Sequence, residues 1–146
     1  MKKIAILPLY QAPHYAEQVT DWLWQAFGEG LSREFFHSII EHSQTPGALP
    51  LTFIAVEDEK LVGTVGLWRC DLITRQDLFP WLAALYVDDA SRGKGLAGKL
   101  QQHVITWAAQ AGYEELHLWS ACRDFSERYG WQYIGDGLEY PNTRVH

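Results

Sequence analysis

The sequence predicts a mixed α/β domain, in which antiparallel strands come first and a parallel α/β segment follows. Two β-rich runs, 51–56 and 61–69, are separated by only four polar residues, which is typical of a hairpin. A long amphipathic helical pattern over 96–111 then precedes a short apolar run at 116–119. A strand, a helix and a further strand in that order favour parallel pairing, so the predicted sheet is mixed.

The N-terminal half is expected to hold a strand and two helices before the hairpin. Residues 4–9 are apolar and predict a short strand. From 14 to 27 apolar residues recur at steps of three and four, so we expect a helix that ends at Gly28. Ser32 is expected to cap a second helix. This helix carries the apolar residues Phe35, Phe36, Ile39 and Ile40.

The C-terminal half is expected to contain short elements around the long helix. A polar loop, 71–77, leads to a predicted strand over 81–87, and Gly112 ends the long helix. Three short elements should follow, namely a strand over 116–119, a helix over 123–129 and a strand over 131–134. Residues 137–146 are compatible with a last strand, which could pair with a second subunit in a homodimer.

Composition limits the class of protein. With 146 residues, 47% of them hydrophobic, the chain is expected to form a single domain over 1–146. The formal charge of −6 argues against nucleic acid as a partner, and no apolar run approaches the ~20 residues of a membrane span. Cys70 and Cys122 form no C-x-x-C pair, which predicts reduced thiols in a cytoplasmic protein. The histidines have no metal-ligand spacing, so we expect no metal site.

A basic, glycine-rich turn joins the strand over 81–87 to the long helix. It contains Gly93, Gly95 and Gly98 together with Arg92, Lys94 and Lys99. Such a turn directs several backbone N–H groups to one place, and the helix N-terminus adds partial positive charge. The turn therefore predicts a phosphate or pyrophosphate site.

Three known glycine motifs fit this turn in part. The letters satisfy G-x-x-x-x-G-K, but the next residue, Leu100, lacks the hydroxyl that a triphosphate loop uses to hold magnesium. They also satisfy the dinucleotide motif G-x-G-x-x-G. However, strands precede the turn, and Glu114 and Glu115 open the next strand instead of ending it. The third motif is Arg-x-x-Gly-x-Ala, met by Arg92, Gly95 and Ala97.

This third motif resembles the coenzyme A loop of the GNAT superfamily of N-acetyltransferases. Residues 125–131, Phe-Ser-Glu-Arg-Tyr-Gly-Trp, are similar to the F-Y-E-K-L-G-F segment of that family, and 71–83 is similar to a bacterial subgroup with unassigned acceptors. The resemblance implies the GNAT fold, a single three-layer α/β/α domain. It also implies acetyl-CoA as co-substrate.

The resemblance also suggests which residues bind the coenzyme. The backbone of residues 85–87 would pair with the pantetheine arm, and the glycine turn would bind the pyrophosphate. The residues assigned to coenzyme binding are Leu85, Tyr86, Val87, Arg92, Gly93, Lys94, Gly95, Leu96, Ala97, Gly98 and Phe125. Ser126 stands where the family commonly has a tyrosine that protonates the departing thiolate, so it is the candidate acid. Tyr129, three residues on, is the alternative.

An amine acceptor arrives as an ammonium ion and must lose a proton before it attacks the thioester. The candidate bases are Glu57, Asp71, Asp77 and His117. Asp71 is preferred, because the loop ahead of the strand over 81–87 should border the acceptor cleft, and a water relay would need no single base. Five aromatic residues are expected to form either core or pocket wall: Trp22, Trp24, Phe35, Phe36 and Trp81.

The sequence therefore predicts an acetyl-CoA-dependent N-acetyltransferase that acts by direct attack in a ternary complex. The acceptor would be a small-molecule amine or a peptide N-terminus. The alternative is a non-catalytic module that binds and senses acyl-CoA.

Overall fold

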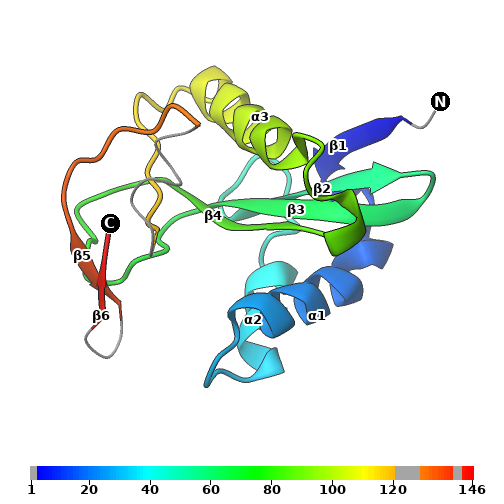
Figure 1. Ribbon diagram of the computed structural model, residues 1–146, viewed down its shortest axis with the longest axis horizontal. Helices are drawn as coiled ribbons and strands as arrows, with labels where there is room; N and C mark the ends of the chain where they lie inside the picture. Colours follow the sequence, from blue (N-terminus) through cyan, green and yellow to red (C-terminus); the bar gives the residue numbers. More distant parts are fainter. Residues whose placement is uncertain (1–2, 121–128, 140–142) are drawn as a thin grey trace.

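A four-stranded antiparallel sheet in the order β1-β2-β3-β4 forms the centre of the molecule (Figure 1). The computed structural model describes residues 3–120, 129–139 and 143–146. The strands are β1 (Ile4–Pro8), β2 (Leu51–Glu57), β3 (Lys60–Trp68) and β4 (Trp81–Val87). The predicted strands over 4–9, 51–56, 61–69 and 81–87 are confirmed to within a residue at their ends.

Helices cover both faces of this sheet, which confirms the predicted three-layer arrangement. Helices α1 (Ala16–Phe27) and α2 (Arg33–Glu41) lie on one face, and α3 (Leu96–Gln110) lies on the other (Figure 1). Ser32 caps α2 as predicted, since its Oγ accepts a hydrogen bond of 3.3 Å from Phe35 N. The described residues also form three short 3-10 turns: η1 (Leu9–Gln11), η2 (Pro13–Tyr15) and η3 (Asp89–Ser91).

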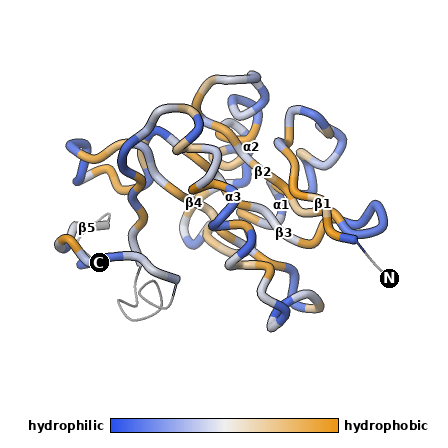
Figure 2. The backbone as a smooth tube through the Cα atoms, turned by 90° about the horizontal axis from the view of Figure 1, so that it is seen from above, coloured by the Kyte–Doolittle hydropathy of each residue, from blue (hydrophilic) through white to orange (hydrophobic). Residues whose placement is uncertain are grey.

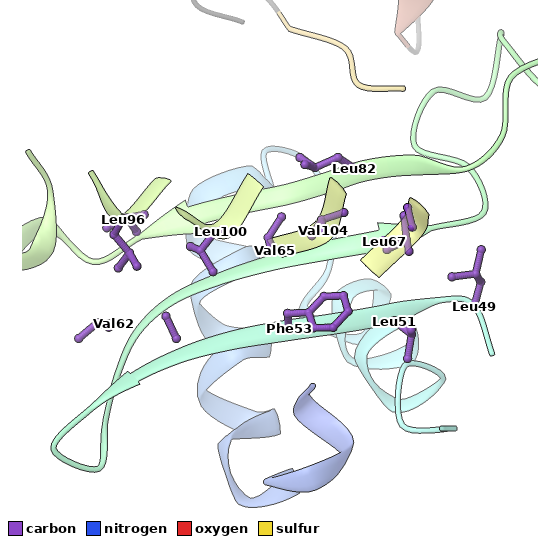
Figure 3. Close-up of a cluster of buried hydrophobic side chains, with 13 residues drawn as sticks. Leu49, Leu51, Phe53, Val62, Val65, Leu67, Leu82, Leu96, Leu100 and Val104 are labelled. Atoms are coloured by element: carbon purple, nitrogen blue, oxygen red, sulfur yellow. The ribbon is translucent and has the colours of Figure 1, made fainter. Parts of the chain in front are cut away.

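Each face of the sheet buries its own apolar cluster. The cluster against α3 includes Phe53, Val65 and Leu67 of the sheet, with Leu100 and Val104 of the helix (Figure 3). The opposite cluster joins α1 and α2 to the sheet and contains Val19, Leu23, Phe36, Ile40, Ile54 and Ala83. Figure 2 shows the same pattern, with hydrophobic stretches along the strands. Burial on both faces holds the central strands in a fixed register.

The turn between β2 and β3 is shorter than the sequence predicts. The strands extend to Glu57 and Lys60, so only Asp58 and Glu59 form the loop, with φ of 51° and 65°. Two successive residues with positive φ form the hairpin turn that matches the twist of the flanking strands.

The predicted strand over 116–119 is wrong in its extent. The segment makes one parallel bridge, between Trp81 and His117. It then leaves β4, and Ser120 exchanges two backbone hydrogen bonds with the terminal residue His146, at 2.6 and 2.9 Å. Ser120 thus pairs with the last residue of the chain and not with β4. Within the described residues, the parallel pairing of the sheet is this one bridge.

The predicted strand over 131–134 is also wrong, because these residues have no strand partner in the part of the chain that is described. Ile134 is 64% exposed, so the apolar run has no sheet to cover. Residues 137–146 form two short strands, β5 (Gly137–Glu139) and β6 (Thr143–Val145), paired antiparallel. This hairpin lies on the opposite side of the molecule from β1 (Figures 1 and 2). The homodimer stays a prediction, as does the helix over 123–129, since 123–128 lie outside the described residues.

Candidate active site

The outer edge of β4 is the first component of the candidate site. Ala84 and Leu85 together oppose the single residue Val65 of β3, and Ala84 has a φ of 52°, so β4 carries a bulge at this point. Within the described residues, the outer edge pairs only around His117, whose backbone bonds Pro80 O and Leu82 N. Beyond Leu82 the edge is therefore available to an extended ligand, which can pair with a strand edge through main-chain hydrogen bonds.

The second component is the glycine turn between β4 and α3. Gly93 and Gly95 both have a φ of 80°, and a Cβ placed on either would meet no atom within 4 Å. Gly95 is the N-cap residue of α3, and no side chain caps this end of the helix. The first amides of this 15-residue helix thus have no side-chain cap and lie beside two glycines with open space around them, so an anion can bind there.

Arg92 holds this turn in place. Its Nε donates to Val87 O at 2.9 Å, its Nη1 lies 2.6 Å from Asp89 Oδ1, and its guanidinium lies 5.4 Å from the centre of the Tyr86 ring. The Tyr86 ring also contacts Trp22, with 5.2 Å between ring centres. Arg92 thus fixes the turn to the end of β4, and Asp89 offsets part of the positive charge expected to face a phosphate.

The other predicted coenzyme-binding residues lie around the first turn of α3. Lys94 and Lys99 are exposed, whereas the side chain of Leu96 is buried in the core, so only its backbone can reach a ligand. Leu85 packs against the α3 cluster. Phe125 and Ser126 lie outside the described residues.

The segment after residue 128 packs on the same helix. The ring of Tyr129 lies against Gly98, 3.6 Å from the position that a Cβ would occupy. Trp131 Nε1 donates to Gln101 Oε1 at 2.7 Å, and Gln101 is only 3% exposed. Tyr129 therefore occupies a packing position on α3. The sequence does not predict this contact, because nothing near Trp131 in the chain indicates which group its indole N–H will bind.

A cavity of about 470 Å³ lies beyond the start of β4. It is lined by the loop between β3 and β4, by residues 115–120, by residues 131–137 and by His146. Much of its wall is apolar and aromatic, and includes Leu72, Leu78, Trp81, Trp119, Trp131 and Tyr133. Of the five aromatic residues considered for an acceptor pocket, only Trp81 lines this cavity. Trp22 packs on Tyr86, Phe36 belongs to the core, and Trp24 and Phe35 are exposed.

Most charged groups around this cavity neutralise one another. Arg75 binds both carboxylate oxygens of Asp77, at 3.0 and 2.9 Å, and this pairing lowers the pKa of Asp77. Asp136 accepts hydrogen bonds from Tyr133 at 2.6 Å, His146 at 2.7 Å and Arg144 at 3.3 Å. These bonds, that of Tyr133 first, lower the pKa of Asp136 to about 2.

His117 is the exception among these groups. Its side chain is 10% exposed, and its buried Nε2 has no hydrogen-bond partner among the described residues. Glu115 Oε2 lies 3.5 Å from this nitrogen, and the His117 and Trp81 rings are 5.8 Å apart. This nitrogen is therefore buried beside Glu115 and does not face the cavity.

The structure separates the four candidate bases. His117 lines the cavity, whereas Asp71, Asp77 and Glu57 do not. Asp71 borders it only through its neighbour Leu72, and its carbonyl accepts a hydrogen bond of 3.0 Å from Trp119 Nε1. Asp77 is bound to Arg75, and Glu57 lies at the β2–β3 turn.

An open strand edge that runs into an uncapped glycine turn is a site for an extended ligand with an anionic end. Residues 16–130 match the model of the acetyltransferase (GNAT) family. This chain belongs to the GNAT acetyltransferase family. The predicted family and fold are thus confirmed, and with them the class of an acetyl-CoA-dependent acetyltransferase.

Solved structures share this fold. An aminoglycoside 6'-N-acetyltransferase complexed with coenzyme A has a TM-score of 0.74 at 16% identity, covering 97% of this chain and 93% of that one. A predicted acetyltransferase from Clostridium acetobutylicum, crystallised with acetyl-CoA, has a TM-score of 0.68 at 16% identity, with 95% of each chain covered. Human N-acetyltransferase 8B is 38% identical over 66 residues, which are 45% of this chain and 29% of that protein.

Within the described residues, no helix is long and apolar enough to cross a membrane.

Proposed function

We propose that this protein transfers an acetyl group from acetyl-CoA to a primary amine, by direct attack in a ternary complex. The observation that carries the proposal is the continuity of the open β4 edge with the unobstructed glycine turn at the start of α3. The two features suit the two parts of the donor, since pantetheine is extended and amide-rich and the pyrophosphate is anionic.

The donor would be held mainly by backbone groups. The backbone of 85–87 would pair with the pantetheine arm, and the amides of 93–98 would surround the pyrophosphate, with Lys94 and Lys99 adding charge. Arg92 would keep the turn in place through its contacts with Val87 and Asp89. The bulge at Ala84 and Leu85 supports this arrangement, because it begins two residues after Leu82, the last residue of β4 that pairs with His117.

The reaction needs two proton transfers besides the attack. The ammonium of the acceptor gives up a proton, the neutral nitrogen attacks the thioester carbonyl carbon, and the thiolate leaves and is protonated. A backbone N–H near Leu85 would polarise that carbonyl. Holding amine and thioester together would supply much of the acceleration.

Ser126 is proposed to hydrogen-bond the departing thiolate. A serine hydroxyl is a weak proton donor, so we expect Ser126→Ala to lower kcat by only a few-fold, within the smaller effects of one hydrogen bond. A fall in kcat of about 100-fold, with KM unchanged, would contradict this minor role and make Ser126 the acid.

The proposal is tested by measuring donor binding and turnover separately. Isothermal titration calorimetry should detect acetyl-CoA binding and no competition from NAD, and thiol release should be observed with at least one member of a panel of primary amines. Absence of acetyl-CoA binding would overturn the proposal. Tight binding without turnover of any amine would favour the acyl-CoA-sensing module instead.

A further inference from the structure

The apolar cavity at the start of β4 lies in the direction in which the acyl end of a bound donor would point. We infer that it is an acyl-chain pocket, which receives an uncharged hydrocarbon chain longer than acetyl from an acyl-CoA donor. This inference rests on the proposed function, because it concerns the donor of the same reaction. It adds longer acyl groups to the acetyl group proposed above.

The direction of the donor follows from the order of the parts of its site. β4 runs from Trp81 to Val87, and the glycine turn at the start of α3 follows it. With the pyrophosphate in that turn and pantetheine beside residues 85–87, the donor extends back along β4 and its acyl group points toward Trp81. Trp81 lines the cavity. A chain that continues past the thioester therefore has the cavity ahead of it.

The separation along β4 distinguishes a short acyl group from a long one. Leu85, near which the thioester is proposed to lie, is four residues after Trp81, which corresponds to about 13 Å along the strand. An acetyl group adds a single methyl beyond its carbonyl carbon and so ends close to Leu85. A longer chain such as octanoyl covers most of this distance, and it would enter a cavity of about 470 Å³ that acetyl leaves empty.

The apolar wall of the cavity continues the cluster on which Leu85 packs. Leu85, Leu116, Leu118 and Trp131 all pack against the cluster between the sheet and α3. The last three of these residues also line the cavity. The proposed thioester position and the cavity therefore share one apolar region, with which a hydrocarbon chain can stay in contact along its length.

Tryptophans of the wall present apolar surface to the cavity. Each indole N–H donates to a group of the protein: Trp81 to Leu78 O at 2.8 Å, Trp119 to Asp71 O at 3.0 Å and Trp131 to Gln101 Oε1 at 2.7 Å. Because these N–H groups are already bound, a ligand meets the rings as hydrocarbon surface. Such a wall favours CH₂ groups over hydroxyls, which would lose their hydrogen bonds with water there.

Charged groups that line the cavity are paired with other described residues. Arg75 binds Asp77, and Asp136 accepts hydrogen bonds from three donors. Glu115 lies 3.5 Å from His117 and is 75% exposed, so water also solvates its carboxylate. An uncharged chain suits this lining, whereas the carboxylate of a succinyl group would lose its hydration there without an equivalent gain.

The reaction with a longer acyl group is the same as with acetyl. The ammonium of the acceptor loses a proton to solvent, its nitrogen forms a bond to the acyl carbonyl carbon, and the C–S bond breaks. The nitrogen loses a second proton as it becomes an amide, and the departing thiolate gains one. The rest of the acyl chain takes no part in these bond changes, so the pocket acts on the affinity for the donor.

The first test is a series of donors of increasing chain length, measured without an acceptor. By isothermal titration calorimetry, we expect the Kd to fall from acetyl-CoA through butanoyl-CoA and hexanoyl-CoA to octanoyl-CoA. Burial of one CH₂ group contributes about 0.8 kcal/mol, so each one that enters the cavity should tighten binding by up to about fourfold. Succinyl-CoA should bind no more tightly than acetyl-CoA. If octanoyl-CoA also bound no more tightly, the inference would be overturned.

The second test uses two substitutions in the loop between β3 and β4. Leu78→Trp adds bulk to a residue that lines the cavity, and Ile73→Trp adds the same ring at a 68%-exposed position that does not line it. We expect Leu78→Trp to raise the Kd of octanoyl-CoA by at least about 10-fold, since it removes space for several CH₂ groups, and to leave the Kd of acetyl-CoA unchanged. Ile73→Trp should bind both donors as the wild type does.

These outcomes distinguish the inference from the proposed function. Failure of the wild type to bind acetyl-CoA would count against the proposed function itself. Equal octanoyl-CoA affinity in Leu78→Trp and Ile73→Trp would place the chain outside the cavity and overturn the inference. A higher KM for the amine in Leu78→Trp, with octanoyl-CoA binding unchanged, would likewise overturn it and assign the cavity to the acceptor. If Leu78→Trp does not fold, Leu78→Phe, a smaller increase in bulk, replaces it in the same comparison.

Discussion

Replacing Gly95 by alanine should weaken coenzyme binding strongly while the protein still folds. Gly95 has a φ of 80°, and a Cβ added to it would meet no atom within 4 Å. Alanine would therefore cause no clash in the free protein, and its only cost would be the left-handed backbone, about 1–2 kcal/mol. The entropy of unfolding of a chain of this length is about 0.3 kcal/mol/K, so the melting temperature should fall by about 3–7 °C.

Coenzyme binding should suffer more than stability does. The new methyl group would lie in the open space beside the turn, where the phosphate is proposed to bind, and should displace one phosphate–amide hydrogen bond. A hydrogen bond to a charged group contributes about 1.5–3 kcal/mol, so the Kd for acetyl-CoA should rise roughly 10- to 150-fold. Gly95→Glu adds bulk and a negative charge, and should abolish binding while the fold is retained.

Gly112→Ala is the matched control. Gly112 follows the other end of α3, has a φ of 95° and likewise has no atom within 4 Å of an added Cβ. It should show the same fall in melting temperature, measured by differential scanning calorimetry, with unchanged acetyl-CoA affinity. If Gly95→Ala bound acetyl-CoA as tightly as Gly112→Ala does, the glycine turn would not be the pyrophosphate site.

Three further substitutions and one control test the fold around the site. Asp136 has a pKa of about 2, below its usual 3.8, so its carboxylate stabilises the fold above about pH 4 and this contribution is lost as the pH falls toward 2. Asp136→Asn should therefore melt below the wild type at pH 7, and the difference should disappear by pH 2. Trp131→Phe would leave the buried Gln101 amide without a hydrogen-bond partner among the described residues and should cost about 1–3 kcal/mol. Trp24→Phe, at a 40%-exposed indole, should cost less. Leu100→Ala, at a fully buried core position, should cost about 2–5 kcal/mol in denaturant unfolding.

Each expectation has a result that would contradict it. A pH-independent difference for Asp136→Asn would mean that its hydrogen bonds do not depend on ionisation. Equal stability of Trp131→Phe and Trp24→Phe would mean that the indole of Trp131 does not hold the C-terminal segment on α3. A cost below about 1 kcal/mol for Leu100→Ala would mean that the cluster under α3 is loosely packed.

The core strands and helices could be predicted from the sequence because local patterns specify them. The β-rich runs over 51–56 and 61–69, the helical spacing over 14–27 and the serine cap of α2 each act over a few residues. The structure forms all three, with the helix beginning at Ala16. The prediction failed after α3. There the apolar runs over 116–119 and 131–134 suggest strands, but whether a run becomes a strand depends on an available partner.

The sequence by itself determined the position of the glycine turn, because a turn that needs positive φ and open space requires glycines. The glycines alone fit three motifs, so the family and the class of donor were predicted from the resemblance of this turn and of residues 125–131 to known acetyltransferases. Only the tertiary structure decided which candidate base lines a cavity. The backbone bonds of His117 to Pro80 and Leu82 hold it beside Trp81, and long-range contacts bring together residues 72–81, 115–120 and 131–137 around the cavity. Such contacts join segments too far apart along the chain for any local pattern to encode them.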